Sequence, residues 1–231
     1  MLFFCGSISA QVTLPSIEKN IQVNSEGVSF TLPVVLKPSF QTINDSIKVY
    51  FNIQGDFSGL QANILALLRN TLNKHEECGE RLSVNSSRLT PHVTKARLEM
   101  SIRFQKWTCI ELFGRDHPNK LFSQSGDLTF LLTPEFDKSQ LILSPELESI
   151  NASGLMSPIL ESDYMKDKVQ EVLERDVSGK LKLLLPEELS NVEVSRIEFK
   201  NANGQLHLIL NSHIIVSSEE FLSLINKIRN D

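Results

Sequence analysis

The sequence predicts an α+β protein in which a strongly curved antiparallel β-sheet wraps around a helix, with a second helix and a short C-terminal helix. Residues 60–73 have helical spacing, and their apolar side spans an arc of roughly 160°, wider than a helix on a flat sheet needs. Residues 96–105 alternate between apolar and polar, as does an antiparallel strand with one solvated face. A helical segment at 163–185 then leads into a predicted hairpin at 192–216. The alternative explanation of the wide arc is an ordinary well-buried helix.

The composition limits the classes of partner. The chain has 231 residues, a net charge of −5 and 41% hydrophobic residues, and we expect residues 11–231 to form a single α+β domain. Nucleic acid binding needs a concentrated basic surface, and no two Lys or Arg residues are adjacent here. No apolar run reaches the length of a membrane span, so we expect neither nucleic acid nor a membrane span, with peripheral membrane contact left open.

The first ten residues, MLFFCGSISA, differ from the rest of the chain. The short apolar run and Ala10 predict the remnant of a secretory signal that is removed before Gln11, and hence a secreted or periplasmic location. Two alternatives are a slightly buried start of the domain and a lipid-anchored Cys5.

Cys78 and Cys109 flank a predicted hairpin, with strands at 81–89 and 93–107. The open ends of a hairpin lie close together, as a disulfide requires, and an even cysteine pair in an exported chain favours such a bond. A metal site that includes His75 is the alternative. Zinc sites use paired close spacings, and no second close ligand accompanies Cys109. We therefore predict a disulfide and no metal site.

The elements before and after this hairpin follow from the alternation of residues. Residues 27–38 predict a β segment that Pro33 interrupts, hence an edge strand or two short pieces. Residues 47–53 alternate as a strand with one buried face. Beyond the hairpin, 114–124 is a polar loop, and two further strands lie at 128–132 and 141–147.

The C-terminal part contains the second helix, a hairpin and the terminal helix. The turn "NANG" joins the strands 192–200 and 206–216, and a bulge near Ser195 and Arg196 would bring the apolar residues of the first strand onto one face. Residues 217–220 have the pattern of a capping box that begins the C-terminal helix.

Catalytic motifs are missing from the sequence. It has no G-x-S-x-G, H-E-x-x-H, Walker A or G-x-G-x-x-G pattern. His207 and His213 would share a strand face, but six residues separate them by roughly 20 Å, too far to hold one metal ion. We expect a protein that is not an enzyme and that needs no cofactor.

In its order of elements the chain resembles the tubular lipid-binding superfamily, which includes the bactericidal/permeability-increasing protein-like modules. The resemblance covers roughly residues 47–216 and consists of the wide helix, the long one-sided strands, and the second helix that leads into a hairpin. It implies a curved sheet around a helix, with an apolar tunnel between them.

Two functions follow as hypotheses. The first is non-enzymatic binding or carriage of a lipid or other apolar ligand in a groove between helix and curved sheet, lined by Leu60, Ile64, Leu67, Leu68, Leu98, Met100, Ile102 and Phe104. The second is a protein-interaction or scaffold domain of the cell envelope or extracellular space, with a solid core. It would recognise a partner through Trp107, the polar loop after it or the C-terminal helix.

Overall fold

The computed structural model describes residues 11–25, 27–43, 45–112, 115–137, 140–153, 183–184 and 193–230. The segment 1–10, including Cys5, lies outside the described residues. So does the second helix predicted at 163–185, except for Leu183–Leu184, which forms the short strand β10 instead. The domain boundary expected at residue 11 therefore stays a prediction.

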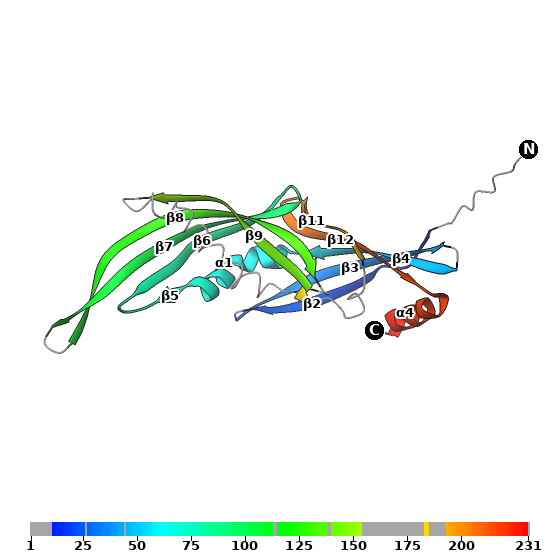
Figure 1. Ribbon diagram of the computed structural model, residues 1–231, viewed down its shortest axis with the longest axis horizontal. Helices are drawn as coiled ribbons and strands as arrows, with labels where there is room; N and C mark the ends of the chain where they lie inside the picture. The colour runs from blue at the N-terminus through cyan, green and yellow to red at the C-terminus, as the bar shows by residue number, and fades with distance from the viewer. Residues whose placement is uncertain are drawn as a thin grey trace, which may run out of the picture.

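The described residues form two antiparallel sheets of six strands each (Figure 1). The terminal sheet contains β1 (Val12–Thr13), β2 (Ile17–Ser25), β3 (Val28–Ile43), β4 (Ser46–Asp56), β11 (Glu193–Ala202) and β12 (Gln205–Val216). Its strand order is β1-β3-β4-β12-β11, and β2 also pairs with β3. The middle sheet has the order β10-β9-β8-β7-β6-β5 and contains β5 (Lys74–His75), β6 (Glu80–His92), β7 (Lys95–Leu112), β8 (Arg115–Asp137), β9 (Gln140–Ser153) and β10.

The predicted fold class is wrong. Instead of one strongly curved sheet wrapped around a helix, the structure has two sheets, and the described residues contain two helices, α1 (Ser58–Leu72) and α4 (Ser218–Asn230). Helix α1 contacts β3 and β12 of the terminal sheet and β6 of the middle sheet. Its apolar arc is wide because two separate sheets cover it from different directions, the arrangement of an ordinary well-buried helix.

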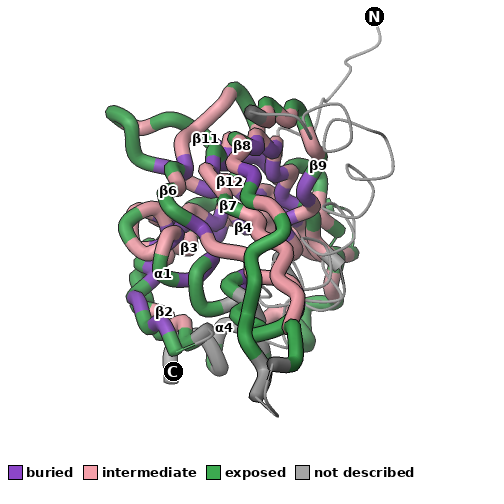
Figure 2. The backbone as a smooth tube through the Cα atoms, turned by 90° about the vertical axis from the view of Figure 1, so that its left-hand side faces the viewer, coloured by how far each residue is buried: buried purple, intermediate pink, exposed green. Residues whose placement is uncertain are grey.

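One hydrophobic core joins α1 to both sheets. It includes Phe30 and Leu32 of β3, Leu98 of β7, Phe130 of β8 and Phe199 of β11. In Figure 2 the buried residues gather in the interior, where strands of both sheets meet. A second, smaller cluster around Val49, Phe51, Ile53 and Leu210 extends the interior toward α4.

Two residues of α1 fix its position against the sheets. A Cβ atom at Gly59 would lie 2.9 Å from the carbonyl oxygen of Thr31, so glycine is what lets the helix approach β3 this closely. The side-chain amide of Gln61 donates to the carbonyls of Leu89 and Gly204, and its oxygen accepts from the N–H of Leu206. Gln61 therefore ties both sheets to the helix.

The sequence predicted that Pro33 marks an edge strand or a break between two short strands, and this prediction is wrong. Strand β3 runs through it as one 16-residue strand between β2 and β4. Pro33 pairs only with Asn20 of β2, and the pairing with β4 begins at the next residue, Val34. The missing N–H of proline therefore removes no hydrogen bond between β3 and β4 at this position.

The predicted polar loop at 114–124 is also wrong, because from Arg115 onward it is part of β8. Strands β7 and β8 pair as far as Leu112 and Arg115, whereas the pairing of β7 with β6 ends at Lys106 and that of β8 with β9 ends at Ser125. We call residues 107–112 with 115–124 the arm. It extends beyond the neighbouring strands at the end of the molecule opposite α4 (Figure 1).

The predictions of the hairpin at 192–216 and of the capping box that follows it are confirmed. Strands β11 and β12 form the expected hairpin, Asn203 and Gly204 have the positive φ angles of its turn, and the register shifts between Val194 and Arg196. The capping box is present at the start of α4, where the N–H of Ser217 donates to Glu220 and the N–H of Glu220 donates to the Ser217 hydroxyl. Phe221 then packs against Phe40, with ring centroids 4.8 Å apart.

Candidate functional site

The residues predicted to line a ligand groove are mostly core residues. Leu60, Ile64, Leu67 and Leu68 of α1 meet Leu98 and Met100 of β7 in the main cluster, and all six are at most 4% exposed. Their packing follows from the periods of the two elements, which point the apolar side of α1 and alternate residues of β7 at each other. These six side chains fill the interior between helix and sheet.

The other two predicted residues, Ile102 and Phe104, lie farther along β7 and are half-buried. Ile102 packs against the core cluster, as do Leu82 of β6 and Ile150 of β9. Phe104 stands opposite Leu82 in the register, and its ring lies 5.9 Å from that of Phe122 on β8. We call Leu82, Ile102, Phe104, Phe122 and Ile150 the apolar shelf. It continues the inner face of the middle sheet outward from the core.

Small residues lie on the shelf beside Ile102. Ile102 is opposite Gly126 of β8, and Gly126 is opposite Ala152 of β9. Residues that stand opposite one another across strands project from the same face. On the β8 and β9 side of Ile102, the row therefore carries no side chain at Gly126 and only a methyl group at Ala152. The sequence predicted the β7 part of the shelf, but Phe122 was missed because it fell in the supposed polar loop.

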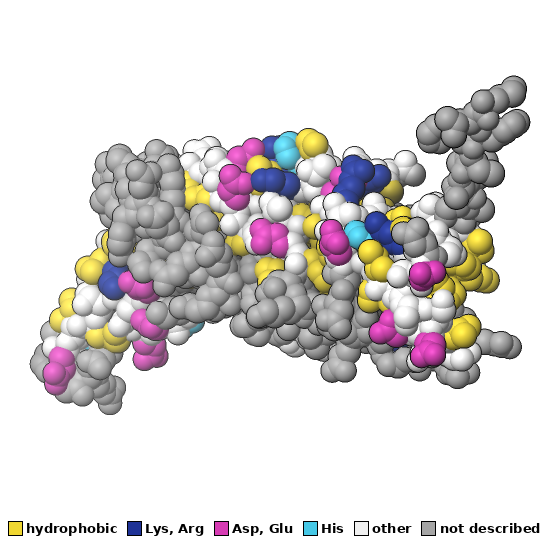
Figure 3. All heavy atoms as spheres, turned by 45° about the vertical axis from the view of Figure 1, so that its right-hand side comes forward, with side chains coloured by type: hydrophobic (Ala, Val, Ile, Leu, Met, Phe, Trp, Pro, Cys, Tyr) yellow, Lys and Arg dark blue, Asp and Glu magenta, His cyan; other side chains and the backbone are white. Residues whose placement is uncertain are grey.

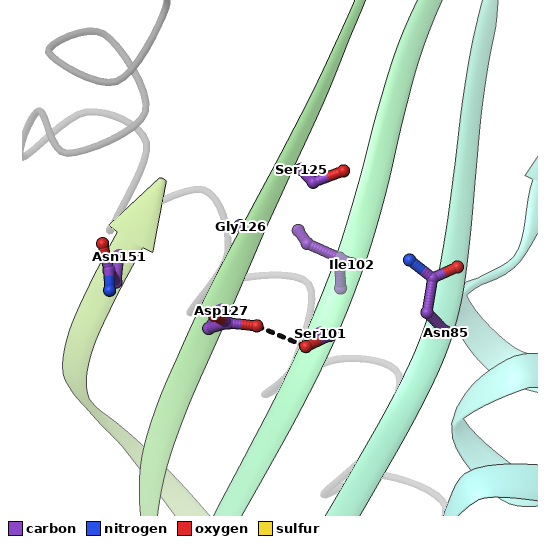
Figure 4. Close-up of a pocket in the computed structure, with 7 residues that line it drawn as sticks. All are labelled: Asn85, Ser101, Ile102, Ser125, Gly126, Asp127 and Asn151. Atoms are coloured by element: carbon purple, nitrogen blue, oxygen red, sulfur yellow. Dashed lines mark hydrogen bonds between the residues drawn. The ribbon is translucent and has the colours of Figure 1, made fainter. Parts of the chain in front are cut away.

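The opposite face of the middle sheet is polar and shallowly hollowed. One pocket of about 260 Å³ is lined by Asn85, Ser101, Ile102, Ser125, Gly126, Asp127 and Asn151. A second, of about 390 Å³, shares Ser101 and Asp127 with it and extends along the strands to Arg88 and Glu99. In Figure 4, Asn85 and Asn151 lie on opposite sides of the two strands that carry Ser101 and Asp127.

The chemistry of this polar face is that of hydrogen bonding. The hydroxyl of Ser101 donates to the carboxylate of Asp127, as the dashed line in Figure 4 shows. Activating a serine as a nucleophile normally takes a stronger base such as histidine, and no histidine lines either pocket among the described residues. The face also carries ion pairs, Lys95 with Glu146 at 2.8 Å and Arg97 with Glu148 at 2.9 Å.

The disulfide prediction is confirmed. Cys78 and Cys109 are bonded, with Cα atoms 5.2 Å apart and a separation of 31 positions in sequence. Around the bond, Arg81 donates to the carbonyls of Glu76 and Glu77, and its guanidinium lies 3.9 Å from the centre of the Trp107 ring. The turn before β6 is thereby fixed to the base of the arm.

The metal alternative loses its cysteine, because the sulfur of Cys78 is part of the disulfide. Each of two histidines on β12 lies near one carboxylate, His213 at 3.2 Å from Glu193 and His207 at 4.0 Å from Asp56. Throughout the part of the chain that the structure describes, no group of three or more His, Cys, Asp or Glu side chains is placed to hold a metal ion.

Both signs of charge are present on the surface of the described residues. On the face drawn in Figure 3, acidic and basic side chains are interspersed. Among the described residues, Glu220 has a clear shift: its pKa lies below the ordinary glutamate range because the N–H and the hydroxyl of Ser217 both donate to its carboxylate. This shift belongs to the cap of α4.

Neither described helix is long and apolar enough to span a membrane.

Comparisons with known proteins add no family to this description. No family model, curated protein or solved structure gives a significant match to the chain. The disulfide is compatible with an oxidising, extracellular location.

Proposed function

We propose that this protein binds or carries a lipid or another apolar ligand without catalysing a reaction, and that the ligand lies on the apolar shelf. The observation that carries the proposal is the half-burial of the shelf. Ile102, Phe104 and Phe122 continue the apolar alternation of the core to a part of the sheet where their side chains are still partly accessible. The groove between helix and curved sheet is not part of the proposal, because the core residues fill that space.

Apolar contacts alone can supply the free energy of binding at such a site. Burying an alkyl chain against the shelf would contribute about 0.8 kcal/mol per methylene group. The two phenylalanine rings add broad, flat contact surfaces at low conformational cost, since each has few rotatable bonds. An amphiphile of moderate chain length would therefore bind with useful affinity through its apolar part alone.

Lipid extraction and a binding assay test the proposal. We expect lipid to co-purify with gently isolated protein in mass spectra, and a fluorescent fatty acid to bind with an affinity that falls at least several-fold in Phe104→Ser and Phe122→Ser variants. The matched control is Ile215→Ser, which changes an apolar residue of the terminal sheet that is 62% exposed. If neither co-purified lipid nor uptake of the fatty acid is observed, the proposal fails.

A second candidate is a protein-interaction or scaffold domain with a solid core. The filled interior between α1 and β7 supports it, and so does the arm, on which Ile110 is 46% and Leu121 is 58% exposed. A photo-crosslinking amino acid at position 110 should then join a partner protein in an extract of the source cells, whereas the same group at position 215 should not. Equal cross-linking from both positions would count against it.

We further propose export to a secreted or periplasmic location, which the Cys78–Cys109 bond supports. Cell fractionation with a thiol count on unreduced protein tests this. Recovery in a reducing compartment with both thiols free would contradict it. The resemblance to the tubular lipid-binding superfamily stays a hypothesis, and it is supported by the order of elements alone.

A further inference from the structure

The apolar shelf ends at a charged side chain. The inner-face residues of β7 are apolar from the core outward, and Lys106 is the next residue of that series after Phe104. In the register, Lys106 stands opposite Glu80 on β6 and Phe122 on β8. The side chain of Lys106 therefore projects from the same face as the shelf, at the register position opposite Phe122.

Lys106 is held only loosely where it is. Its Nζ lies 3.2 Å from a carboxylate oxygen of Glu80, and the two side chains are 40% and 46% exposed. Ion pairs this accessible to water contribute little to stability, so exchanging the Glu80 carboxylate for another anion costs little. The long aliphatic stem of lysine can also lie along apolar surface while its charged end reaches a new partner.

A second positive charge lies at the β6 edge of the shelf. Arg69, near the end of α1, donates to the carbonyls of Val84 and Asn85, and Val84 is the register partner of Ile102. Among the interactions of the described residues, no carboxylate pairs with Arg69. Arg69, Lys106 and Glu80 together leave an excess of one positive charge around the shelf.

We propose that the ligand of the shelf is a single-chain amphiphile with an anionic headgroup, a carboxylate or a phosphate, and that Lys106 binds this headgroup in competition with Glu80. This inference rests on the proposed function. Ile102 and Lys106 are four residues apart on one strand, which is about 13 Å, and this places the headgroup one alkyl chain of medium length away from the core.

Three dodecyl probes with different headgroups test the proposal on the full chain: dodecyl phosphate, dodecylphosphocholine and dodecyl maltoside. We expect the wild-type protein to bind dodecyl phosphate most tightly, with a preference over the maltoside that shrinks as salt is added. Lys106→Gln should weaken binding of the phosphate roughly twofold to fivefold and leave the maltoside unchanged. Glu80→Gln should tighten binding of the phosphate, because the internal competitor is removed.

The outcomes separate this inference from the proposed function. If no probe binds at the shelf, the proposed function fails and this inference fails with it. If all three probes bind with equal affinity and Lys106→Gln changes none of these affinities, the shelf binds apolar chains but does not select an anionic headgroup, and this inference is wrong. Tightest binding of dodecylphosphocholine, with losses in both Lys106→Gln and Glu80→Gln, would also overturn it, because the ion pair would then be recognising a zwitterion.

Discussion

The side-chain oxygen of Gln61 accepts a hydrogen bond of 2.7 Å from the N–H of Leu206, although the two residues are 145 positions apart in sequence. The amide nitrogen of the same side chain donates to the carbonyl of Leu89 at 3.0 Å. Leu206 belongs to the terminal sheet and Leu89 to the middle sheet. One glutamine of α1 thus satisfies backbone groups of both sheets at the place where they meet the core.

Replacing this glutamine should cost more than an ordinary surface change. In a Gln61→Leu variant the N–H of Leu206 and the carbonyl of Leu89 lose their partner in a partly buried place, which costs up to about 1 to 3 kcal/mol for each unsatisfied group. We expect a fall of several kcal/mol in the free energy of unfolding, measured by urea denaturation. Gln22→Leu is the control, since Gln22 makes its side-chain hydrogen bond on the exposed surface. Equal effects of the two changes would contradict the assigned role.

The disulfide should stabilise the fold through the loop that it closes. For a sequence separation of 31 between the two cysteines, the chain-entropy model gives a contribution of about 3 to 4 kcal/mol. A Cys78→Ser, Cys109→Ser double variant should therefore unfold at lower urea concentration. Reducing agent should have the same effect on the wild-type protein and none on the variant. If the double variant were as stable as the wild-type protein, the disulfide would add nothing to the stability that the noncovalent contacts of Arg81 provide.

Arg81 should act through its planar guanidinium as well as its charge. Arg81→Lys keeps the positive charge but loses two features of the guanidinium. These are the forked donation to the backbone carbonyls of Glu76 and Glu77 and the close contact with the Trp107 ring. Trp107 is the only tryptophan of the chain, so its fluorescence reports on this contact directly. We expect a shifted emission and a loss of about 1 kcal/mol in stability. An unchanged spectrum would mean that the stacking does not persist in solution.

The filled core predicts a large penalty for a cavity beside α1. Leu68 is fully buried, so Leu68→Ala should lower the free energy of unfolding by about 2 to 5 kcal/mol. Leu222→Ala removes the same atoms from a side chain that is 63% exposed and should have little effect. Thermal or urea unfolding of the pair measures the difference. Similar stabilities would indicate that the space around Leu68 is not filled.

The cap of α4 should depend on pH. The pKa of Glu220 is lowered in the folded state, so its contribution to stability is present above the unfolded pKa and is lost as the pH falls through the folded value. The first turn of α4 should therefore loosen only in acid, below the ordinary titration range of glutamate. NMR titration of the Glu220 carboxyl measures this pKa, and Ser217→Ala should raise it toward the usual value. A pKa that Ser217→Ala leaves unchanged would contradict the assigned cause.

The sequence by itself determined the elements that depend on local patterns. The alternation of β4 and β7, the apolar side of α1, the turn at Asn203 and Gly204, and the cap at Ser217 all follow from residues close together in the chain. The Cys78–Cys109 bond could also be predicted from the sequence, because hairpin pairing fixes which residues lie near each other.

Only the tertiary structure decided how these elements are arranged. The wide apolar side of α1 is the same whether one curved sheet wraps it or two sheets cover it, so the periodicity of residues 58–72 does not distinguish the two folds. Likewise, the polar composition of residues 115–124 favours a loop, but cross-strand hydrogen bonds to β7 hold them as a strand. Which apolar residues fill the core and which remain on the shelf depends on where α1 ends against β6. That is a property of packing between distant segments, and no local pattern encodes it.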